Sequence, residues 1–273
     1  MTAMQNIVSV RASSFGSLFD CAYKWEGQHI LGMKMPSSPR AHLGTAIHSG
    51  TAIYDLAMLE KIEGFTAKDA AESMLHELRN PEYEVNWAAE TDLTLKKAEI
   101  IALSLLDLYM SKIAPNYTFI DIERKVIPLD IDTGAGVIIR LTGSLDRARV
   151  SKCGSGVSIV DVKTGRLAVT AEGLAKTKGH RPQLGTYEIL YEQDTGIACD
   201  DSEIIGLKTF GTPAAATAKV SNAKQLLLGT ENQKGYIQMA GEIFRSGLFT
   251  PNPQSQLCSA KYCPRFNSCI YHD

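Results

Sequence analysis

The chain has 273 residues, a formal net charge of −2, 44% apolar residues and 21% charged residues, which is typical of a globular protein with a well-buried core. The near-neutral charge does not itself indicate nucleic-acid binding, although a local cleft can bind phosphates without a basic average. No run reaches the roughly 18 apolar residues of a membrane span, and the N-terminus lacks a signal peptide's apolar core. We therefore expect an intracellular, cytoplasmic protein without a membrane segment.

The first 115 residues are predicted to be mainly helical. Residues 13–31 begin with a serine that can cap a helix and place apolar side chains at helical spacing, so we expect one amphipathic helix there. A proline-serine loop separates it from a helix that carries His48 on a small, apolar surface. The last helix before Pro115 has a buried apolar stripe and Thr91 as its expected cap. The expected helices cover residues 13–31, 41–59, 66–80 and 91–113.

The pattern changes from helix to strand near Pro115. Apolar segments are separated by the glycine-containing turns TGAG and KCGSG, which suit hairpin connections. We therefore expect an antiparallel meander of three strands. These strands are expected at residues 119–129, 136–150 and 156–165.

After the meander, we expect a helix at residues 181–193 and a buried strand at residues 203–212. Residues 220–247 are expected to form a long helix that breaks near Gly229 or Gly235. The C-terminal tail has many turn residues and few apolar ones. We therefore expect a further tie to hold it to the rest of the chain.

Three of the six cysteines fall within the last sixteen residues. Inside a cell such a cluster is more typical of a metal site than of disulfides. Four thiolates suit a [4Fe–4S] cluster or a structural zinc ion. Zinc ligands usually come as CxxC pairs, so a division into one cysteine and three favours iron–sulfur, with free cysteines as the third alternative. The candidate ligands are Cys21, Cys258, Cys263 and Cys269, whereas Cys153 and Cys199 have no partner at ligand spacing.

Two carboxylates and a lysine lie near the ends of two predicted strands. Asp161 and Lys163 are two residues apart and share one strand face, while Val162 points into the core. Asp146 takes a comparable position on the neighbouring strand, and an unpaired carboxylate in such a buried place would be costly. Carboxylates can hold Mg²⁺ or Mn²⁺, and a lysine can orient or deprotonate the water that attacks a phosphodiester. The DxK pair alone is a weak signal, because it occurs by chance on many exposed strands.

Four short motifs follow one another along the chain: GTAIH at 44–48, GSLDR at 143–147, DVKTG at 161–165 and QLGTY at 183–187. In order and in spacing they resemble the PD-(D/E)XK nuclease superfamily, specifically its RecB-like branch. The resemblance implies an α+β fold with an α/β/α restriction-endonuclease-like core. Its central mixed sheet would begin with the antiparallel meander and be flanked by helices.

The resemblance also implies a metal site. His48, Asp146 and Asp161 would be ligands of one or two Mg²⁺ or Mn²⁺ ions, and the backbone carbonyl of Val162 would complete the metal shell. Arg147 is interpreted as a strand-end ion-pair residue outside the catalytic set.

Three further residues complete the implied catalytic set. Lys163 would be the catalytic lysine. Gln183 and Tyr187 lie four residues apart on one helical face, where the resemblance implies that they support the lysine and touch DNA. The basic segment 166–181 between these motifs is expected either to contact phosphates or to be a solvated loop.

The division of the cysteines resembles the iron–sulfur subset of RecB-like nucleases, in which one cysteine precedes the nuclease core and three follow it. The resemblance implies that Cys21, Cys258, Cys263 and Cys269 hold a [4Fe–4S] cluster, with structural zinc as the alternative. In the commonest form the first two of the three C-terminal cysteines are only two residues apart, which differs from the spacing here. Such a clasp would tie the N-terminal helix to the tail and couple metal binding to folding.

We expect a single nuclease domain over residues 1–273. It would comprise a mainly helical part (1–115), a catalytic sheet with the QxxxY helix (116–212), and a C-terminal helix with the cysteine clasp (213–273). The expected function is a metal-dependent deoxyribonuclease, an exonuclease acting on DNA ends or single strands in repair, recombination or phage DNA processing. A recombination or replication protein is an expected partner. The alternatives are a catalytically inactive nuclease-like DNA-binding or scaffold protein, and a zinc-stapled interaction protein.

Overall fold

A five-stranded sheet carries the DxK segment. The computed structural model describes residues 6–152 and 156–272. The strands of this sheet are β2 (Phe119–Lys125), β5 (Ser144–Val150), β6 (Val157–Gly165), β7 (Cys199–Lys208) and β8 (Ala214–Val220). They are ordered β2-β5-β6-β7-β8, with β6 and β7 parallel and every other pair antiparallel. β2, β5 and β6 are antiparallel neighbours as the expected meander requires, but two strands of a second sheet lie between β2 and β5 in the chain, so only the hairpin of β5 and β6 follows the prediction. β8 is an edge strand that the sequence pattern did not indicate.

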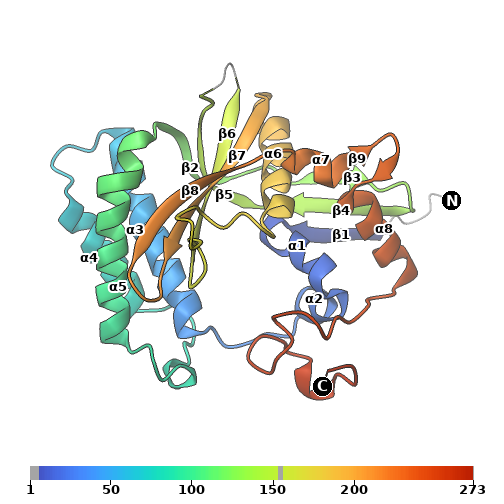
Figure 1. Ribbon diagram of the computed structural model, residues 1–273. Coiled ribbons are helices and arrows are strands. Elements are labelled where there is room, and N and C mark those ends of the chain that lie inside the picture. The colour runs from blue at the N-terminus through green and yellow to red at the C-terminus, as the bar shows by residue number, and fades with distance from the viewer. Residues whose placement is uncertain (1–5, 153–155, 273) are drawn as a thin grey trace.

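Helices cover both faces of this sheet (Figure 1). They are α1 (Ala12–Asp20), α3 (Pro39–Glu60), α4 (Ala67–Arg79), α5 (Leu95–Leu108) and α6 (Arg181–Thr195). Val160 and Val162 of β6 pack in the core that α3, α4 and α5 cover, while Ile159 packs in the core that α1 and α6 cover. Because successive strand residues point to opposite faces, Asp161 and Lys163 share the face of Ile159. The mixed sheet between helical layers confirms the predicted α+β class.

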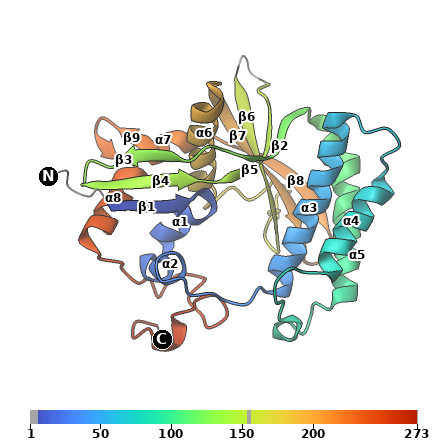
Figure 2. The same ribbon diagram turned by 180° about the vertical axis from the view of Figure 1, so that it is seen from behind.

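A second sheet has three strands, β1 (Asn6–Arg11), β4 (Val137–Thr142) and β3 (Leu129–Asp132). β4 is central, with β1 parallel to it and β3 antiparallel, and Figure 2 shows this sheet on the side of the molecule away from α4 and α5. The prediction of one strand at 136–150 is wrong, because the chain leaves β4 at Gly143 and enters the other sheet as β5. The Tyr187 ring lies 2.8 Å from where a Cβ on Gly143 would be, so this crossing needs a residue without a side chain.

Two expected helices have different bounds. The segment 13–31 forms α1 and α2 (Ala22–His29), because Cys21 between them has extended backbone angles (φ −148°, ψ 97°). The last helix before the sheet begins at Leu95, where the Thr94 hydroxyl, and not that of Thr91, accepts the capping hydrogen bond from the Lys97 N–H. Short turns complete this region, namely η1 (Trp87–Ala89), η2 (Tyr109–Ile113) and η3 (Ala114–Asn116).

The C-terminal part interrupts its expected long helix at both glycines. Gly229 has a left-handed φ of +78°, and Gly235 is the residue that precedes the last helix, so a short hairpin separates two helices. These elements are α7 (Ala223–Leu228), β9 (Gly229–Thr230), β10 (Gln233–Lys234), α8 (Tyr236–Ser246) and the turn η4 (Phe266–Ser268).

The tail after α8 packs against the N-terminal helices through polar contacts. The Ser255 hydroxyl donates a hydrogen bond to Asp20 (2.6 Å), and Arg265 forms an ion pair with Glu26 (2.7 Å). Arg265 also stacks on the Tyr23 ring, with its guanidinium carbon 4.0 Å from the ring centre. These contacts are part of the tie that the composition of the tail led us to expect.

Candidate active site

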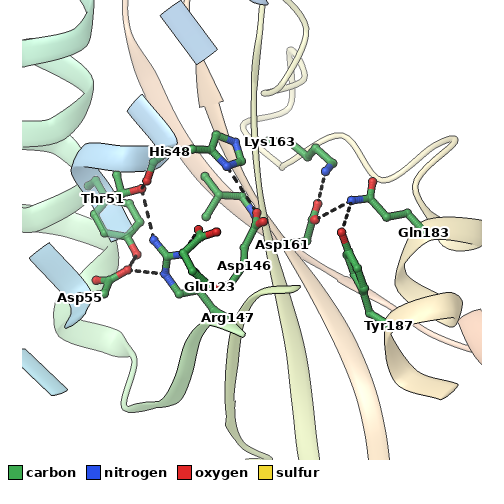
Figure 3. A network of polar contacts seen from close by, with 12 residues as sticks. His48, Thr51, Asp55, Glu123, Asp146, Arg147, Asp161, Lys163, Gln183 and Tyr187 are labelled. Atoms are coloured by element: carbon green, nitrogen blue, oxygen red, sulfur yellow. Dashed lines mark hydrogen bonds and ion pairs between the residues drawn. The ribbon is translucent and has the colours of Figure 1, made fainter. Parts of the chain in front are cut away.

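The two strand-end acids meet where β5 and β6 separate. The ladder between these strands ends at the pair of Arg147 and Val160, so Asp146 and Asp161 occupy the next register position. Residues directly opposite in an antiparallel pair share a face, which places the two carboxylates beside each other (Figure 3). Instead of continuing the ladder, the Val162 N–H donates a hydrogen bond to Asp146 Oδ2 (2.8 Å). The site is therefore a fork in the sheet with an acid on each branch.

The backbone of Val162 faces this fork. In an extended strand the N–H and C=O of one residue point toward the same edge. Because the Val162 N–H points to Asp146, its carbonyl lies on the same edge and faces the fork. This orientation agrees with the metal-ligand role that the resemblance implies for the Val162 carbonyl.

Lys163 lies beside the deeply buried Asp161. Its Nζ is 2.5 Å from Asp161 Oδ2, and the Asp161 side chain is 1% exposed. Burial, opposed by Lys163 and assisted by Asp146, raises the pKa of Asp161 to about 7. A carboxyl group with this pKa is poised to exchange a proton for a metal ion near neutral pH.

Helix α6 contributes an amide and a phenol to the site. Gln183 Nε2 donates to Asp161 Oδ1 (3.1 Å) and to the Tyr187 hydroxyl (3.2 Å). Gln183 is therefore linked to Lys163 through Asp161, the acid that pairs with the lysine. Its contact on Oδ1 fixes the rotation of the Asp161 carboxylate.

Helix α3 brings His48 to the other acid. Its Nδ1 lies 3.5 Å from Asp146 Oδ2. Burial lowers the pKa of His48, although Asp146 opposes this shift. The imidazole is therefore neutral at neutral pH, which is the form that binds metals.

Glu123 is a site residue that the sequence pattern did not reveal. Ile122 pairs with Arg147 and Arg124 pairs with Leu145, so Glu123 lies opposite Asp146 across β2 and β5. It has a left-handed φ of +49°, which is uncommon for a residue other than glycine and is often found at functional sites. The alternating segment FIDIERK contains no signal that separates this glutamate from an ordinary exposed acid.

The donor atoms of the fork suit Mg²⁺ or Mn²⁺, which prefer oxygen ligands. Asp161 Oδ2 is buried and has Lys163 as its ion-pair partner, but it accepts no well-aligned hydrogen bond within the described part of the chain. Asp146 Oδ2 contacts both His48 and the Val162 N–H. Among residues 6–152 and 156–272, no three His, Cys, Asp or Glu side chains converge closely enough to enclose a cation. The side chains of the site therefore bond to one another in this arrangement, and a bound metal would replace some of these contacts.

The chain also matches the sequence pattern of a known protein family. The model of the PD-(D/E)XK nuclease superfamily matches residues 10–270. The chain belongs to this superfamily. Its members typically are phosphodiester hydrolases that use a divalent metal ion. No curated protein matches the chain.

Solved structures agree with the fold of this superfamily member. A crystal structure from Eubacterium rectale, described as a "Putative exonuclease", superimposes with a TM-score of 0.51 and 15% sequence identity. The similarity covers 92% of this chain and 86% of that chain. At this identity the likeness bears on the fold alone. Within the described residues, no helix is long and apolar enough to cross a membrane.

The basic segment between the DxK strand and α6 is less charged than its composition suggests. Burial and the nearby Lys163 and Lys176 lower the pKa of His180 to about 4, so this imidazole is neutral at neutral pH. Arg166 stacks on the Phe210 ring, with its guanidinium carbon 4.1 Å from the ring centre. The positive charges of the segment therefore come from its lysines and arginines.

The four candidate cluster ligands line a cavity whose lining contains none of the fork residues. The cavity is also lined by Lys24, which is 8% exposed. The Asn252 N–H donates a hydrogen bond to Cys21 Sγ (3.4 Å). The thiols are gathered around one space, although they are not as close as bound ligands would be. The cysteines that line the cavity are Cys21, Cys258, Cys263 and Cys269.

The other two cysteines differ from this set. Cys199 begins β7, and its Sγ contacts the Glu188 carbonyl (3.8 Å). Cys153 lies outside the described residues.

Proposed function

We propose that the protein is a metal-dependent deoxyribonuclease that hydrolyses phosphodiester bonds at the fork between β5 and β6. The observation that carries this proposal is the position of Asp146 and Asp161 directly beyond the last ladder pair of β5 and β6, with Lys163 Nζ 2.5 Å from Asp161 Oδ2. His48, both acids and the Val162 carbonyl would hold one or two Mg²⁺ or Mn²⁺ ions. When bound, such an ion lowers the pKa of a water molecule and stabilises the charge that develops on phosphate oxygens.

The side chains around the ion have separate roles in this proposal. Lys163 places a positive charge at the acids, where it can orient the attacking water and offset phosphate charge. In its neutral form the same amine could instead take a proton from that water. Gln183 holds one oxygen of Asp161 and leaves the other for Lys163 and the metal. Tyr187 holds Gln183 in place through its hydroxyl. His48 is neutral and can therefore bind metal without first losing a proton.

The order of the four motifs supports a finer proposal. We place the chain in the RecB-like branch, as an exonuclease on DNA ends or single strands in repair, recombination or phage DNA processing. A recombination or replication protein would then direct it to its DNA. We also propose that residues 1–273 act as one nuclease domain, because α3, β5, β6 and α6 each supply a part of a single site.

The cysteine cavity supports a second metal centre with a structural role. Four cysteines fit a [4Fe–4S] cluster, and structural zinc is the alternative. Lys24 fits such a group, since a buried ammonium offsets negative charge that four thiolates bring to a metal. The centre would join α1 and α2 to the tail.

The test is hydrolysis of 5′- and 3′-labelled single- and double-stranded DNA by anaerobically purified protein with Mg²⁺ or Mn²⁺. We expect cleavage by the wild type and a loss of at least about a hundredfold in Lys163→Ala, since acid–base groups contribute about 10² to 10⁴ in rate. Unchanged hydrolysis by Lys163→Ala would falsify the assignment. DNA binding without cleavage by the wild type in any divalent metal would favour an inactive DNA-binding protein.

A further inference from the structure

We propose that Arg147 is a positioning residue of the metal site, which fixes the helix of His48 relative to the strand of Asp146. This inference rests on the proposed function, because it takes both residues as metal ligands. Arg147 is 1% exposed and lies at the centre of the contacts in Figure 3. Its side chain points from β5 toward α3, on the sheet face opposite to Asp161.

Arg147 is connected to the backbones of both ligand residues. Its Nη1 donates to the Asp146 carbonyl (2.8 Å), and its Nη2 contacts the Thr51 hydroxyl (3.4 Å). Thr51 in turn donates to the His48 carbonyl (3.0 Å). The His48 and Asp146 side chains face each other at 3.5 Å, which closes a ring of contacts. Arg147 can therefore set the spacing of the two ligands without touching their side chains.

Asp55 anchors this ring in the core. Its Oδ2 accepts hydrogen bonds from Arg147 Nε (2.6 Å) and from the Tyr109 hydroxyl (2.5 Å). His48, Thr51 and Asp55 are spaced three and four residues apart, so they lie along one face of α3. Tyr109 follows α5, which packs against α3. The guanidinium is thus tied to β5, α3 and the end of α5 at once.

Arg147 also reaches the acid opposite Asp146. Its Nη1 lies 3.1 Å from Glu123 Oε1, while Glu123 and His48 line one cavity. A planar guanidinium has donors in several directions and can make these contacts together. A lysine at position 147 would keep the positive charge but could not make the same set of hydrogen bonds in several directions.

Arg149 offers a matched control on the same strand. It lies two residues further on and therefore on the same face of β5. It is 3% exposed and forms an ion pair with Glu203 of β7 (3.0 Å). In the described part of the chain its guanidinium donates to the Val150 carbonyl and to Glu203, and neither belongs to α3 or the fork. Arg149→Lys therefore alters a buried arginine and its ion pair without altering the ring around the metal site.

The experiment measures Mn²⁺ binding to DNA-free protein by electron paramagnetic resonance, with thermal unfolding recorded for each variant. We expect Arg147→Lys to raise the dissociation constant for Mn²⁺ at least about tenfold, while Arg149→Lys leaves it unchanged. Thr51→Val removes only the hydroxyl link to His48, and we expect a rise of about fivefold, the value of one typical hydrogen bond. The Mg²⁺ concentration for half-maximal DNA hydrolysis should shift by the same factors.

Three results would overturn the inference. Wild-type affinity in both Arg147→Lys and Thr51→Val would show that the ring does not position the ligands. If Arg147→Lys and Arg149→Lys weaken Mn²⁺ binding equally, the effect comes from replacing any buried arginine of β5 by lysine and not from the ring of contacts. If Arg147→Lys fails to fold, Thr51→Val alone decides the question. Absence of Mn²⁺ binding in the wild type would overturn the metal site itself and the inference with it, which separates this failure from one of positioning alone.

Discussion

In the proposed metal site, Asp161 would make metal binding depend on pH. Its pKa is raised to about 7 by burial, well above the ordinary value of about 3.9 for an aspartate. Below pH 7 the carboxyl group of the metal-free protein is protonated, so a metal ion must displace this proton. Above pH 7 the group is ionised and no proton needs to leave. Metal affinity should therefore fall as pH is lowered through about 7 and level off above it.

This pH dependence can be measured by Mn²⁺ titration of DNA-free protein between pH 5.5 and 8. We expect the dissociation constant to rise about tenfold for each pH unit below 7, the slope of a single proton. His48 has a lowered pKa and should contribute little above pH 6.5. An affinity that stays constant across this range would contradict a raised pKa for Asp161.

Much of the candidate site could be predicted from single residues, because strand and helix periodicities fix which side chains share a face. Asp161 and Lys163 are neighbours on one strand face, and Gln183 and Tyr187 are neighbours on one helix face. The position of Glu123 depends on a register and on a left-handed φ. Neither is encoded in local periodicity.

The ion-pair partners of Arg147 also could not be predicted from the sequence. From the sequence Arg147 is a bystander of the catalytic set, and a simple strand-end ion pair with Asp146 is the alternative role for the two residues. Its carboxylate partners are Asp55 and Glu123, which are 92 and 24 positions away in the chain. From Asp146 it contacts only the backbone carbonyl. Partners that lie so far away in the chain cannot be read from residue spacing.

At the scale of elements, the position of α3 against β6 depends on Gly44. A Cβ at this residue would lie 2.5 Å from the Thr164 hydroxyl oxygen, so an added methyl group would force the Thr164 side chain to rotate or the helix to move away from the strand. His48 is one helical turn further along α3 and would move with it. Packing of α3 against β6 therefore explains the glycine of the GTAIH motif, independently of the chemistry of the histidine.

Gly44→Ala should lower the free energy of unfolding by about 1–3 kcal/mol, the usual cost of overpacking, and should weaken Mn²⁺ binding. Gly16→Ala is a matched control in helix α1, since its Cβ would meet its nearest neighbour at an ordinary 3.5 Å. In a helix this control should be neutral or slightly stabilising. Urea unfolding and Mn²⁺ titration check both variants, and equal stability of the two would argue against the close approach of α3.

The boundaries of elements were harder to predict than their existence. The segments 119–129 and 136–150 each have continuous β character, yet each is divided between two sheets. The crossing from β4 to β5 depends on the close approach of the Tyr187 ring to Gly143. This is a tertiary contact, which a local sequence pattern does not show. The edge strand β8 (AAATAKV) consists mostly of small residues. Because alanine has a weak β-propensity, the sequence pattern does not predict a strand there.

At the scale of the whole molecule, the proposed cysteine centre would join the same two parts of the chain as the polar contacts, the N-terminal helices and the tail. Protein purified without oxygen should be brown, with a broad absorbance near ~400 nm from an iron–sulfur cluster. Cys263→Ser should remove this absorbance, whereas Cys199→Ser should keep it because Cys199 lies outside the cavity. A colourless protein with one zinc per chain would select zinc, and intact absorbance in Cys263→Ser would exclude Cys263 as a ligand.

The joint between the tail and α1 has a consequence for the timing of folding. Ser255 and Asp20 are hydrogen-bonded although 235 positions separate them. During synthesis, α1 and α2 leave the ribosome long before their tail partner exists, so their polar groups around Asp20, Tyr23 and Glu26 stay in water until the last segment arrives. A chain that ends before residue 251 would keep this surface uncovered. These contacts therefore distinguish a chain that contains residues 251–265 from one that stops before them, and the shorter chain would offer proteases a surface that this segment covers.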